Sequence, residues 1–224
     1  MACFDFGKIA HRHDRWYQTR RGAWYDRMEK EAVAALLPGA RDGPKLLDVG
    51  CGTGHWSQYL AAKGYNVTGV DVSEQMIQIA RGKDIANSRF FIADGENLPF
   101  ADNHFDVVTA ITSLEFMAHP KQVLSEMVRC VKKPNGTLII GTLNALSPYI
   151  KEKIRRRTSF YASGVFFSPK QVEDLLSRFG EVKTQVVGLV PKIDWLLPLS
   201  PITEFLSKLI RSQRGAFIVA KVNL

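Results

Sequence analysis

Three acidic residues and a glycine-rich turn are the parts of this sequence best placed to do chemistry together. The turn, Gly50-Cys51-Gly52-Thr53-Gly54, follows an apolar run that contains Asp48 and precedes a helical segment. Glycines in such a turn let the backbone bend tightly and let a ligand lie against it, opposite the N-terminus of the next helix. Asp71 and Asp94 follow the next two apolar runs. We expect all three acids at the carboxyl edge of a parallel sheet, where open α/β sheets bind ligands.

The spacing of the glycines excludes two common nucleotide-binding loops. A phosphate loop needs a lysine followed by serine or threonine, but His55 and Trp56 stand where those residues would be. The dinucleotide fingerprint needs the pattern G-x-G-x-x-G, whereas the glycines here fall at positions 50, 52 and 54. The sequence therefore disfavours a nicotinamide-dependent dehydrogenase.

The chemistry of the three acids favours a cationic derivative of adenosine. Asp48, near the end of its strand, would repel a pyrophosphate and attract a positive charge. Asp71 can accept hydrogen bonds from both hydroxyls of a ribose, and Asp94 can accept one from an adenine amino group. S-adenosylmethionine, a positively charged adenosine derivative without phosphates, fits this description.

With these residues in place, the sequence resembles the class I S-adenosylmethionine-dependent methyltransferases over residues 12–144. It is most similar to the small-molecule branch, methyltransferase type 11, which includes the ubiquinone/menaquinone-biosynthesis enzymes. The resemblance implies methyl transfer from S-adenosylmethionine, with S-adenosylhomocysteine as product. It rests on Asp48-Val49-Gly50-Cys51-Gly52-Thr53-Gly54, on Asp71, on Ala93-Asp94-Gly95-Glu96-Asn97-Leu98-Pro99-Phe100, on Phe105-Asp106-Val107-Val108 and on Leu114-Glu115-Phe116.

The predicted cofactor site collects the turn, the acids and the end of the fourth apolar run. In it, Asp48 would hold the methionyl amine through water or backbone. Trp16, Tyr17 and Glu115 are candidates for a substrate lid, whereas no residue is identified as catalytic. We expect no metal, because the three cysteines and the histidines lack ligand spacing. The candidate cofactor residues are Asp48, Gly50, Cys51, Gly52, Thr53, Gly54, Asp71, Val72, Met76, Asp94, Gly95, Glu96, Ala110, Ile111 and Thr112.

Apolar runs alternate with helical segments, which favours a doubly wound α/β fold. We expect a Rossmann-like sheet of seven strands, mostly parallel, with one antiparallel strand near the C-terminus. Helices are predicted over residues 23–37 and 55–63, and after the caps Ser73, Pro120 and Ser168. The strands are predicted at residues 45–49, 66–70, 89–93, 105–111, 137–142, 182–187 and 216–222.

The 224 residues have ordinary globular composition and are interpreted as a single methyltransferase domain, residues 1–224. Residues 1–43 would form a helical extension or lid, and residues 44–143 the cofactor-binding core. Residues 144–224 would add the last strands, with an inserted apolar and basic lid segment. The sequence shows no secretory signal and no membrane-spanning run, which predicts a cytoplasmic protein.

The net charge of +8 is concentrated in the last third of the chain, where residues 144–224 hold 13 basic and 6 acidic residues. The basic run 151–157 fits a solvated helix face, a peripheral contact with an anionic membrane surface, or a nucleic acid. We expect a small, lipophilic acceptor, methylated by in-line displacement without obligatory nucleic acid. A tRNA methyltransferase and a non-catalytic S-adenosylmethionine-binding module are the alternatives, and the oligomeric state stays open.

Overall fold

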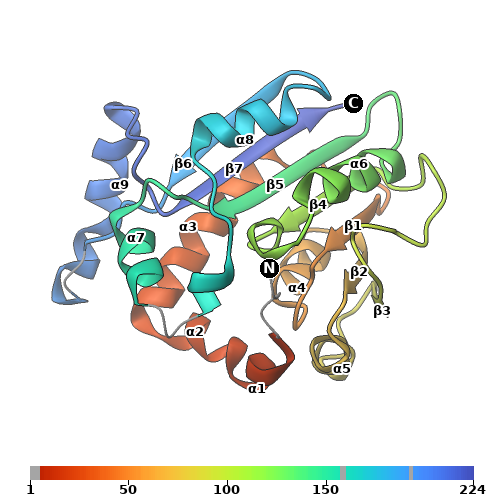
Figure 1. Ribbon diagram of the computed structural model, residues 1–224, viewed down its shortest axis with the longest axis horizontal. Coiled ribbons are helices and arrows are strands. Elements are labelled where there is room, and N and C mark those ends of the chain that lie inside the picture. The colour runs from red at the N-terminus through yellow and green to blue at the C-terminus, as the bar shows by residue number, and fades with distance from the viewer. Residues whose placement is uncertain (1–5, 157–159, 192–193) are drawn as a thin grey trace.

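A computed structural model describes residues 6–156, 160–191 and 194–224, in which a seven-stranded sheet carries helices on both faces (Figure 1). The strand order is β3-β2-β1-β4-β5-β7-β6, and only β7 runs against its neighbours. The predicted doubly wound sheet with one antiparallel strand is therefore confirmed. The strands are β1 (Lys45–Val49), β2 (Asn66–Asp71), β3 (Ser88–Ile92), β4 (Val107–Ile111), β5 (Thr137–Leu143), β6 (Val182–Val187) and β7 (Phe217–Asn223).

Helices cover both faces of the sheet because their apolar residues recur at helical spacing. Helices α3 (Arg20–Leu36) and α4 (His55–Ala62) pack on one face, and α6 (Pro120–Cys130) and α8 (Pro169–Leu176) pack on the other. Helix α5 (Glu74–Gly82) packs against Phe90 of β3 near the edge of the sheet. The central strand β4 is buried along its whole length, as expected for a parallel strand covered on both faces.

Two predicted helix starts are confirmed by their capping hydrogen bonds. The Ser73 hydroxyl accepts the backbone N–H of Met76 at the start of α5. At the start of α8, the Ser168 hydroxyl accepts the N–H of Gln171, whose side chain accepts the N–H of Ser168 in return. Such caps satisfy backbone donors that have no partner inside the helix, so local sequence is enough to fix these helix starts.

Several boundaries differ from the predictions for local reasons. Helix α3 begins at Arg20 rather than at residue 23, because Thr19 accepts the N–H of Gly22 and caps the helix earlier. Strand β4 begins at Val107 rather than at residue 105, since Phe105 forms only an isolated bridge with Val131.

The sequence analysis predicts no individual bounds for the remaining elements, although residues 1–43, which hold the first of them, are expected to be helical. These elements are η1 (Phe6–Ile9), α1 (Ala10–His13), α2 (Arg15–Gln18), η2 (Leu114–Phe116), α7 (Pro148–Arg155), η3 (Phe160–Ser163), η4 (Asp194–Leu199) and α9 (Ser200–Leu209). Most are only four to ten residues long. Short segments like these depend on tertiary packing more than on intrinsic propensity.

Candidate active site

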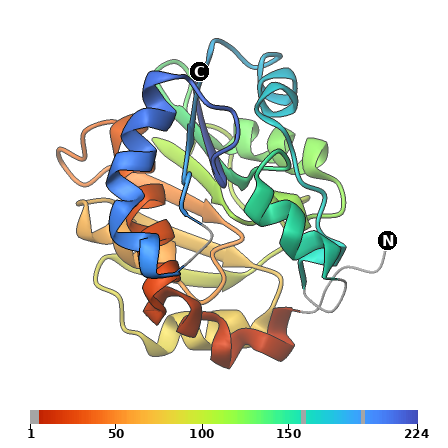
Figure 2. The same ribbon diagram turned by 90° about the vertical axis from the view of Figure 1, so that its left-hand side faces the viewer.

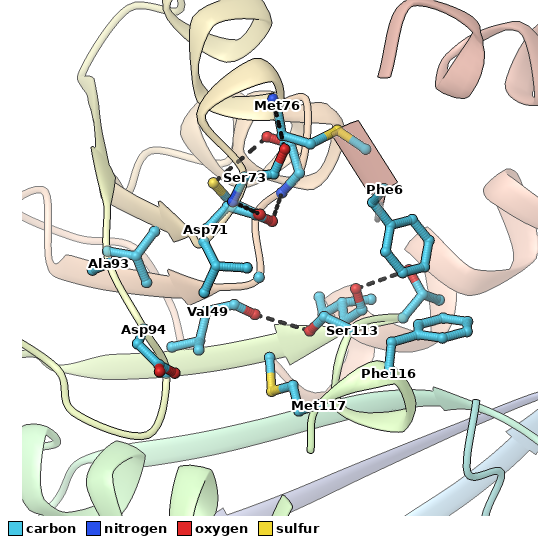
Figure 3. A pocket seen from close by; sticks show the side chains of 18 of the residues that line it. Phe6, Val49, Asp71, Ser73, Met76, Ala93, Asp94, Ser113, Phe116 and Met117 are labelled. Atoms are coloured by element: carbon cyan, nitrogen blue, oxygen red, sulfur yellow. Dashed lines mark hydrogen bonds between the residues drawn. The ribbon is translucent and has the colours of Figure 1, made fainter. Parts of the chain in front are cut away.

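A cavity of about 710 Å³ opens at the carboxyl ends of β1, β2 and β4, where the sequence analysis placed the ligand. Its walls differ in character (Figure 3). Asp71, Ser73 and Asp94 lie toward one end, whereas Phe6 and Phe116 face each other at the other end. The cavity thus joins a polar half, suited to hydrogen bonding, with an apolar half.

The glycine turn shapes the cavity in two different ways. Gly50 has a φ of 73°, and a Cβ added to it would lie 2.5 Å from the Cβ of Ser113, so no side chain fits there. Gly52 has a φ of 53°, but an added Cβ would meet only the Sδ of Met76, at 4.0 Å. The space in front of Gly52 is therefore open, and a ligand can approach its backbone closely. The N–H groups of Gly50 and Cys51 both bond the carbonyl oxygen of Val70, which fixes the turn to the end of β2.

Asp71 lines the cavity, and both of its carboxylate oxygens accept backbone hydrogen bonds. Its Oδ2 accepts the N–H of Gly52 and its Oδ1 accepts the N–H of Ser73, each at 2.9 Å. Burial raises the pKa of Asp71, against the lowering effect of these donors. Each oxygen keeps a second lone pair, so the carboxylate can still accept hydrogen bonds from two neighbouring hydroxyl groups.

The segment after β3 contributes a second acidic wall. Asp94 closes a tight turn, because its Oδ1 accepts the N–H of Glu96 at 2.9 Å. The Glu96 carboxylate lies 2.8 Å from Nδ1 of His119. A Cβ at Gly95 would approach Val49 to 3.2 Å, so this stretch of backbone lies tightly against β1. Asp94, Gly95 and Glu96 all line the cavity.

Thr112 follows β4 in a strained conformation. Its φ is 51°, in the left-handed region that a β-branched residue rarely occupies. The N–H of Thr112 bonds the carbonyl oxygen of Gly141 at 2.7 Å, which helps to hold it there. Such strain costs about 1–3 kcal/mol and clusters at functional sites. Here it lies on the wall of the cavity, beside Ile111.

Asp48 does not line the cavity, so its carboxylate is not placed to contact a ligand there directly. It is buried in β1, where Ser57 and Thr109 donate hydrogen bonds to it at 2.7 Å and 3.1 Å. Burial raises the pKa of Asp48 to about 6, against the lowering effect of these two hydroxyl donors. Its carboxylate therefore ties β1 to β4 and to the start of α4, beneath the glycine turn.

Of the fourteen other candidate cofactor residues, eleven line the cavity: Gly50, Cys51, Gly52, Asp71, Val72, Met76, Asp94, Gly95, Glu96, Ile111 and Thr112. Three more do not. Thr53 is buried and turned toward Asp14, Gly54 packs against Ala80, and Ala110 points into the core. Of the lid candidates only Tyr17 reaches the cavity.

The other two lid candidates lie behind the cavity wall. Trp16 stacks on Tyr25, with ring centroids 6.5 Å apart. Glu115 is buried, and its Oε1 accepts the N–H of Leu143 at 3.0 Å. The sequence could not show which way these side chains turn, because the partners lie on segments distant in the chain.

The N-terminal segment 6–18 packs over the cavity through contacts made by Asp14 and Tyr17. Asp14 accepts a hydrogen bond from the Thr53 hydroxyl at 2.6 Å and pairs with the Lys83 ammonium at 2.6 Å. Burial raises the pKa of Asp14, but hydrogen bonds from His13, Lys83 and Thr53 outweigh it and hold the pKa well below its ordinary value. Tyr17 stacks on His55, with ring centroids 3.6 Å apart.

Comparison with known proteins decides the family. The methyltransferase domain family matches residues 47–140, the span from β1 to β5 that carries the glycine turn and Asp71. The uncharacterized protein MJ1123 of Methanocaldococcus jannaschii is 34% identical over 179 residues, which cover 78% of this chain and 80% of that protein. The chain belongs to the class I S-adenosylmethionine-dependent methyltransferases. Its cofactor is accordingly S-adenosylmethionine.

Two further similarities place this methyltransferase in the small-molecule branch. The demethylmenaquinone methyltransferase of Renibacterium salmoninarum is 38% identical over 124 residues, which cover 55% of this chain but only 48% of that enzyme. The structure of a methyltransferase from Thermotoga maritima, described as a possible histamine N-methyltransferase, superimposes with a TM-score of 0.74. That protein is 27% identical, and the match covers 97% of each chain.

Aromatic side chains from three separate segments close the apolar end of the methyltransferase cavity. Phe6 from the N-terminus and Phe116 from η2 contact each other edge to face, with ring centroids 5.0 Å apart. Phe160 and Phe166, from the insertion after β5, pack against Phe116 at 5.7 Å and 5.9 Å. The sequence does not predict Phe6, Phe160 or Phe166 as part of the site, because no periodicity relates them. Phe116 belongs to the Leu114-Glu115-Phe116 motif, which does not show that its ring lies at the cavity.

Removing the Asp14 carboxylate should loosen the N-terminal segment 6–18 of the methyltransferase. We expect Asp14→Ala to weaken S-adenosylhomocysteine binding about tenfold, because a charge-assisted hydrogen bond contributes roughly 1.5–3 kcal/mol. Amide hydrogen exchange in residues 10–18 should become faster. Asp14→Asn, which can still accept from Thr53 but loses the ion pair with Lys83, should show a smaller effect. Unchanged affinity and unchanged exchange in Asp14→Ala would show that the Asp14 contacts do not hold segment 6–18 over the cavity.

Proposed function

We propose that this methyltransferase transfers the methyl group of S-adenosylmethionine to a small acceptor with an apolar, ring-sized body. The observation that supports this proposal is the aromatic end of the cavity, where Phe6, Phe116 and Met117 meet. Ligand sites of this kind are lined mainly by apolar side chains with a few polar groups for orientation. The cavity of about 710 Å³ lies within the usual range for such sites.

In this proposal the polar half of the cavity holds the cofactor. Asp71 accepts the two ribose hydroxyls, Asp94 accepts from the adenine amino group, and the open backbone at Gly52 faces the methionyl part. Asp48 acts from below by bracing β1 under the turn. Val72 and Met76 give apolar contact surfaces on the same side. These residues bind and orient the cofactor, so that its methyl group is directed toward the aromatic end.

The reaction itself needs positioning more than it needs a catalytic acid or base. S-adenosylmethionine would supply an activated methyl group that passes to the acceptor as its carbon–sulfur bond breaks in line, with S-adenosylhomocysteine as the leaving group and any proton on the acceptor atom released to water. Holding the reactants in line and away from water can supply several kcal/mol of the acceleration. The segment 6–18 and the aromatic cluster, which share Phe6, would provide that enclosure together.

Transfer of a labelled methyl group to three classes of acceptor tests this function. We expect label to appear in apolar phenols or quinols, with little in hydrophilic amines and none in tRNA. Phe116→Ala should raise KM for the best acceptor about tenfold or more, since burying a Phe side chain contributes roughly 1.5–3 kcal/mol. S-adenosylhomocysteine affinity should stay within about twofold. Phe91→Ala, which truncates an exposed ring on β3, is the matched control.

Other outcomes would replace the proposal. Label found in tRNA would favour the RNA methyltransferase alternative, for which the basic helix α7 would then be the contact surface. Tight S-adenosylhomocysteine binding without turnover in any acceptor class would favour a non-catalytic binding module. Unchanged kinetics in Phe116→Ala would mean that the acceptor lies elsewhere in the cavity.

A further inference from the structure

Helix α9 and the turn before it carry most of the large apolar side chains that the described part of the chain exposes. The set comprises Trp195, Leu199, Ile202, Phe205, Leu206, Leu209 and Ile210. Trp195 is 73% exposed, Phe205 66% and Leu209 70%. Residues 202, 205, 206 and 209 are spaced three and four apart, so they lie on one side of the helix. We call these seven residues the α9 face.

The polarity of α9 is the reverse of that in an ordinary surface helix. Its inward side is polar: Ser200, Glu204 and Ser207 are buried. Oε2 of Glu204 accepts the N–H groups of Gly188 and Leu189 at 3.0 Å and 3.2 Å. The Thr203 hydroxyl donates to the carbonyl oxygen of Leu189 at 2.7 Å. Hydrogen bonds thus anchor the helix through its polar side, and its apolar side remains in contact with water, which is unfavourable unless something covers it.

Among the described side chains of residues 195–214, which carry the α9 face, the exposed charges have one sign. Glu204 is the single acid between residues 195 and 214, and it is buried. Arg211 and Arg214 follow the helix on exposed positions. No exposed carboxylate from this segment is therefore available to pair with the cations of a second copy of the chain. A symmetric contact through the α9 face would bury apolar area but bring like charges together.

The basic helix α7 lies on the same side of the molecule. Figure 2 looks onto this side: α9 (blue, left) and α7 (teal, right) both lie toward the viewer, and α9 lies in front of α3. The start of α7 and the start of α9 also border one small cavity, which Tyr149 and Thr203 line together. Residues 151–156 hold four basic side chains and one acidic side chain, Glu152. Arg157, the last residue of the predicted basic run, lies outside the described residues.

An apolar helix face with flanking cations, and with no exposed acid between residues 195 and 214, has the chemistry of a membrane-surface helix. Such helices lie in the plane of the interface, with Trp, Phe and Leu buried about 5–10 Å into the headgroup and acyl boundary. Nearby lysines and arginines are attracted to anionic headgroups. No helix in the described parts of the chain is long and apolar enough to cross a bilayer. The contact would therefore be peripheral.

We propose that this chain docks on anionic lipid bilayers through the α9 face, with the basic side chains of α7 and of the turn after α9 facing the headgroups. The proposal does not depend on the acceptor, because it concerns a surface outside the cofactor cavity. Its consequence for the molecule is a defined orientation: the side seen in Figure 2 lies against the membrane.

Flotation of the full chain with vesicles tests this docking. We expect the protein to float with vesicles that contain phosphatidylglycerol and phosphatidylcholine, and much less with vesicles of phosphatidylcholine alone. High salt should weaken the binding, since surface electrostatic attraction is screened. Phe205→Glu/Leu209→Glu should lower the partition coefficient at least about tenfold. Phe91→Glu/Ile92→Glu, which adds the same charge to an exposed site on β3, should bind as the wild type does.

A binding measurement distinguishes a loss of membrane docking from a loss of folding. Each variant should bind S-adenosylhomocysteine as the wild type does, which shows that the fold is intact. Absence of flotation in the wild type, or equal flotation on neutral vesicles, would overturn the proposal. It would also be overturned if the wild type were a dimer that Phe205→Glu/Leu209→Glu dissociates, because a second copy would then cover the α9 face.

Discussion

Replacing Asp71 with alanine is expected to weaken S-adenosylhomocysteine binding by about 100-fold or more. The change removes both ribose contacts in the proposed site, and hydrogen bonds to a charged group contribute roughly 1.5–3 kcal/mol each. It also removes the acceptor for the N–H groups of Gly52 and Ser73, which the carboxylate holds at 2.9 Å. The glycine turn would lose its brace at the same time.

Calorimetric titration measures this effect directly. Asp71→Asn keeps the size of the side chain and one acceptor oxygen, so it should retain part of the affinity. Asp174→Ala is the control, because it removes an exposed aspartate on α8 that pairs only at the surface with Lys170. NAD should not bind to the wild type. Binding by Asp71→Ala at wild-type affinity would contradict the assignment of this carboxylate to the ribose.

The second large effect is a fall in stability as the pH rises from about 4.5 to about 8, and it comes from two buried glutamates. Glu29 on α3 and Glu115 on η2 are both buried. Burial, together with the charges of Asp26 and Glu115, raises the pKa of Glu29 to about 8. Burial raises the pKa of Glu115 to about 7, against the lowering effect of the Leu143 N–H. In the folded chain these two acids therefore hold protons that they lose in the unfolded chain.

Stability must then fall as the pH rises. Below the ordinary glutamate pKa of 4.5 both states are protonated, and the acids cost nothing. Between that value and about 8 the unfolded chain has lost the proton of Glu29 while the folded chain keeps it, so unfolding becomes easier. The free energy of unfolding changes by about 1.4 kcal/mol per pH unit for each such group.

Glu29→Gln should remove part of this slope. We expect the variant to unfold at a higher temperature than the wild type at pH 8.5, and at a similar temperature at pH 5. Thermal unfolding measured from pH 5 to pH 9 gives both curves. Glu31→Gln is the matched control on the same helix, since Glu31 is exposed and pairs with Arg27 at the surface. Parallel curves for the wild type and Glu29→Gln would show that Glu29 does not carry the effect.

Local sequence was enough to determine the elements that carry the cofactor site. The glycine turn follows β1 because only residues tolerant of positive φ fit there, and Gly50 and Gly52 both adopt it. Asp71 and Asp94 lie at the cavity because parallel strands end at the same edge. The caps at Ser73 and Ser168 are encoded within three residues of each helix start. Each of these features depends on backbone geometry that neighbouring residues set.

Only the tertiary structure decided which side chains reach the cavity. Asp48 and Thr53 fit the cofactor motif, but their partners Thr109 and Asp14 lie 61 and 39 residues away and turn them from the cavity. Glu115 accepts a hydrogen bond from Leu143, and Phe6 contacts Phe116, which lies 110 positions further along the chain. No local pattern encodes such contacts, because they form when separate layers pack.

The outward apolar side of α9 follows the same rule. The apolar composition of residues 186–210 does not by itself decide whether they are buried, form a lid or a dimer surface, or face a membrane. The hydrogen bonds of Glu204 to Gly188 and Leu189 place the polar side of the helix inward, so its apolar side faces outward. Helix periodicity shows that two sides differ, but the side that is buried depends on the surface it meets. For this chain, local sequence determined the elements at the carboxyl edge of the sheet that line the cavity, and packing between distant segments determined which side chains face the cavity and which face outward.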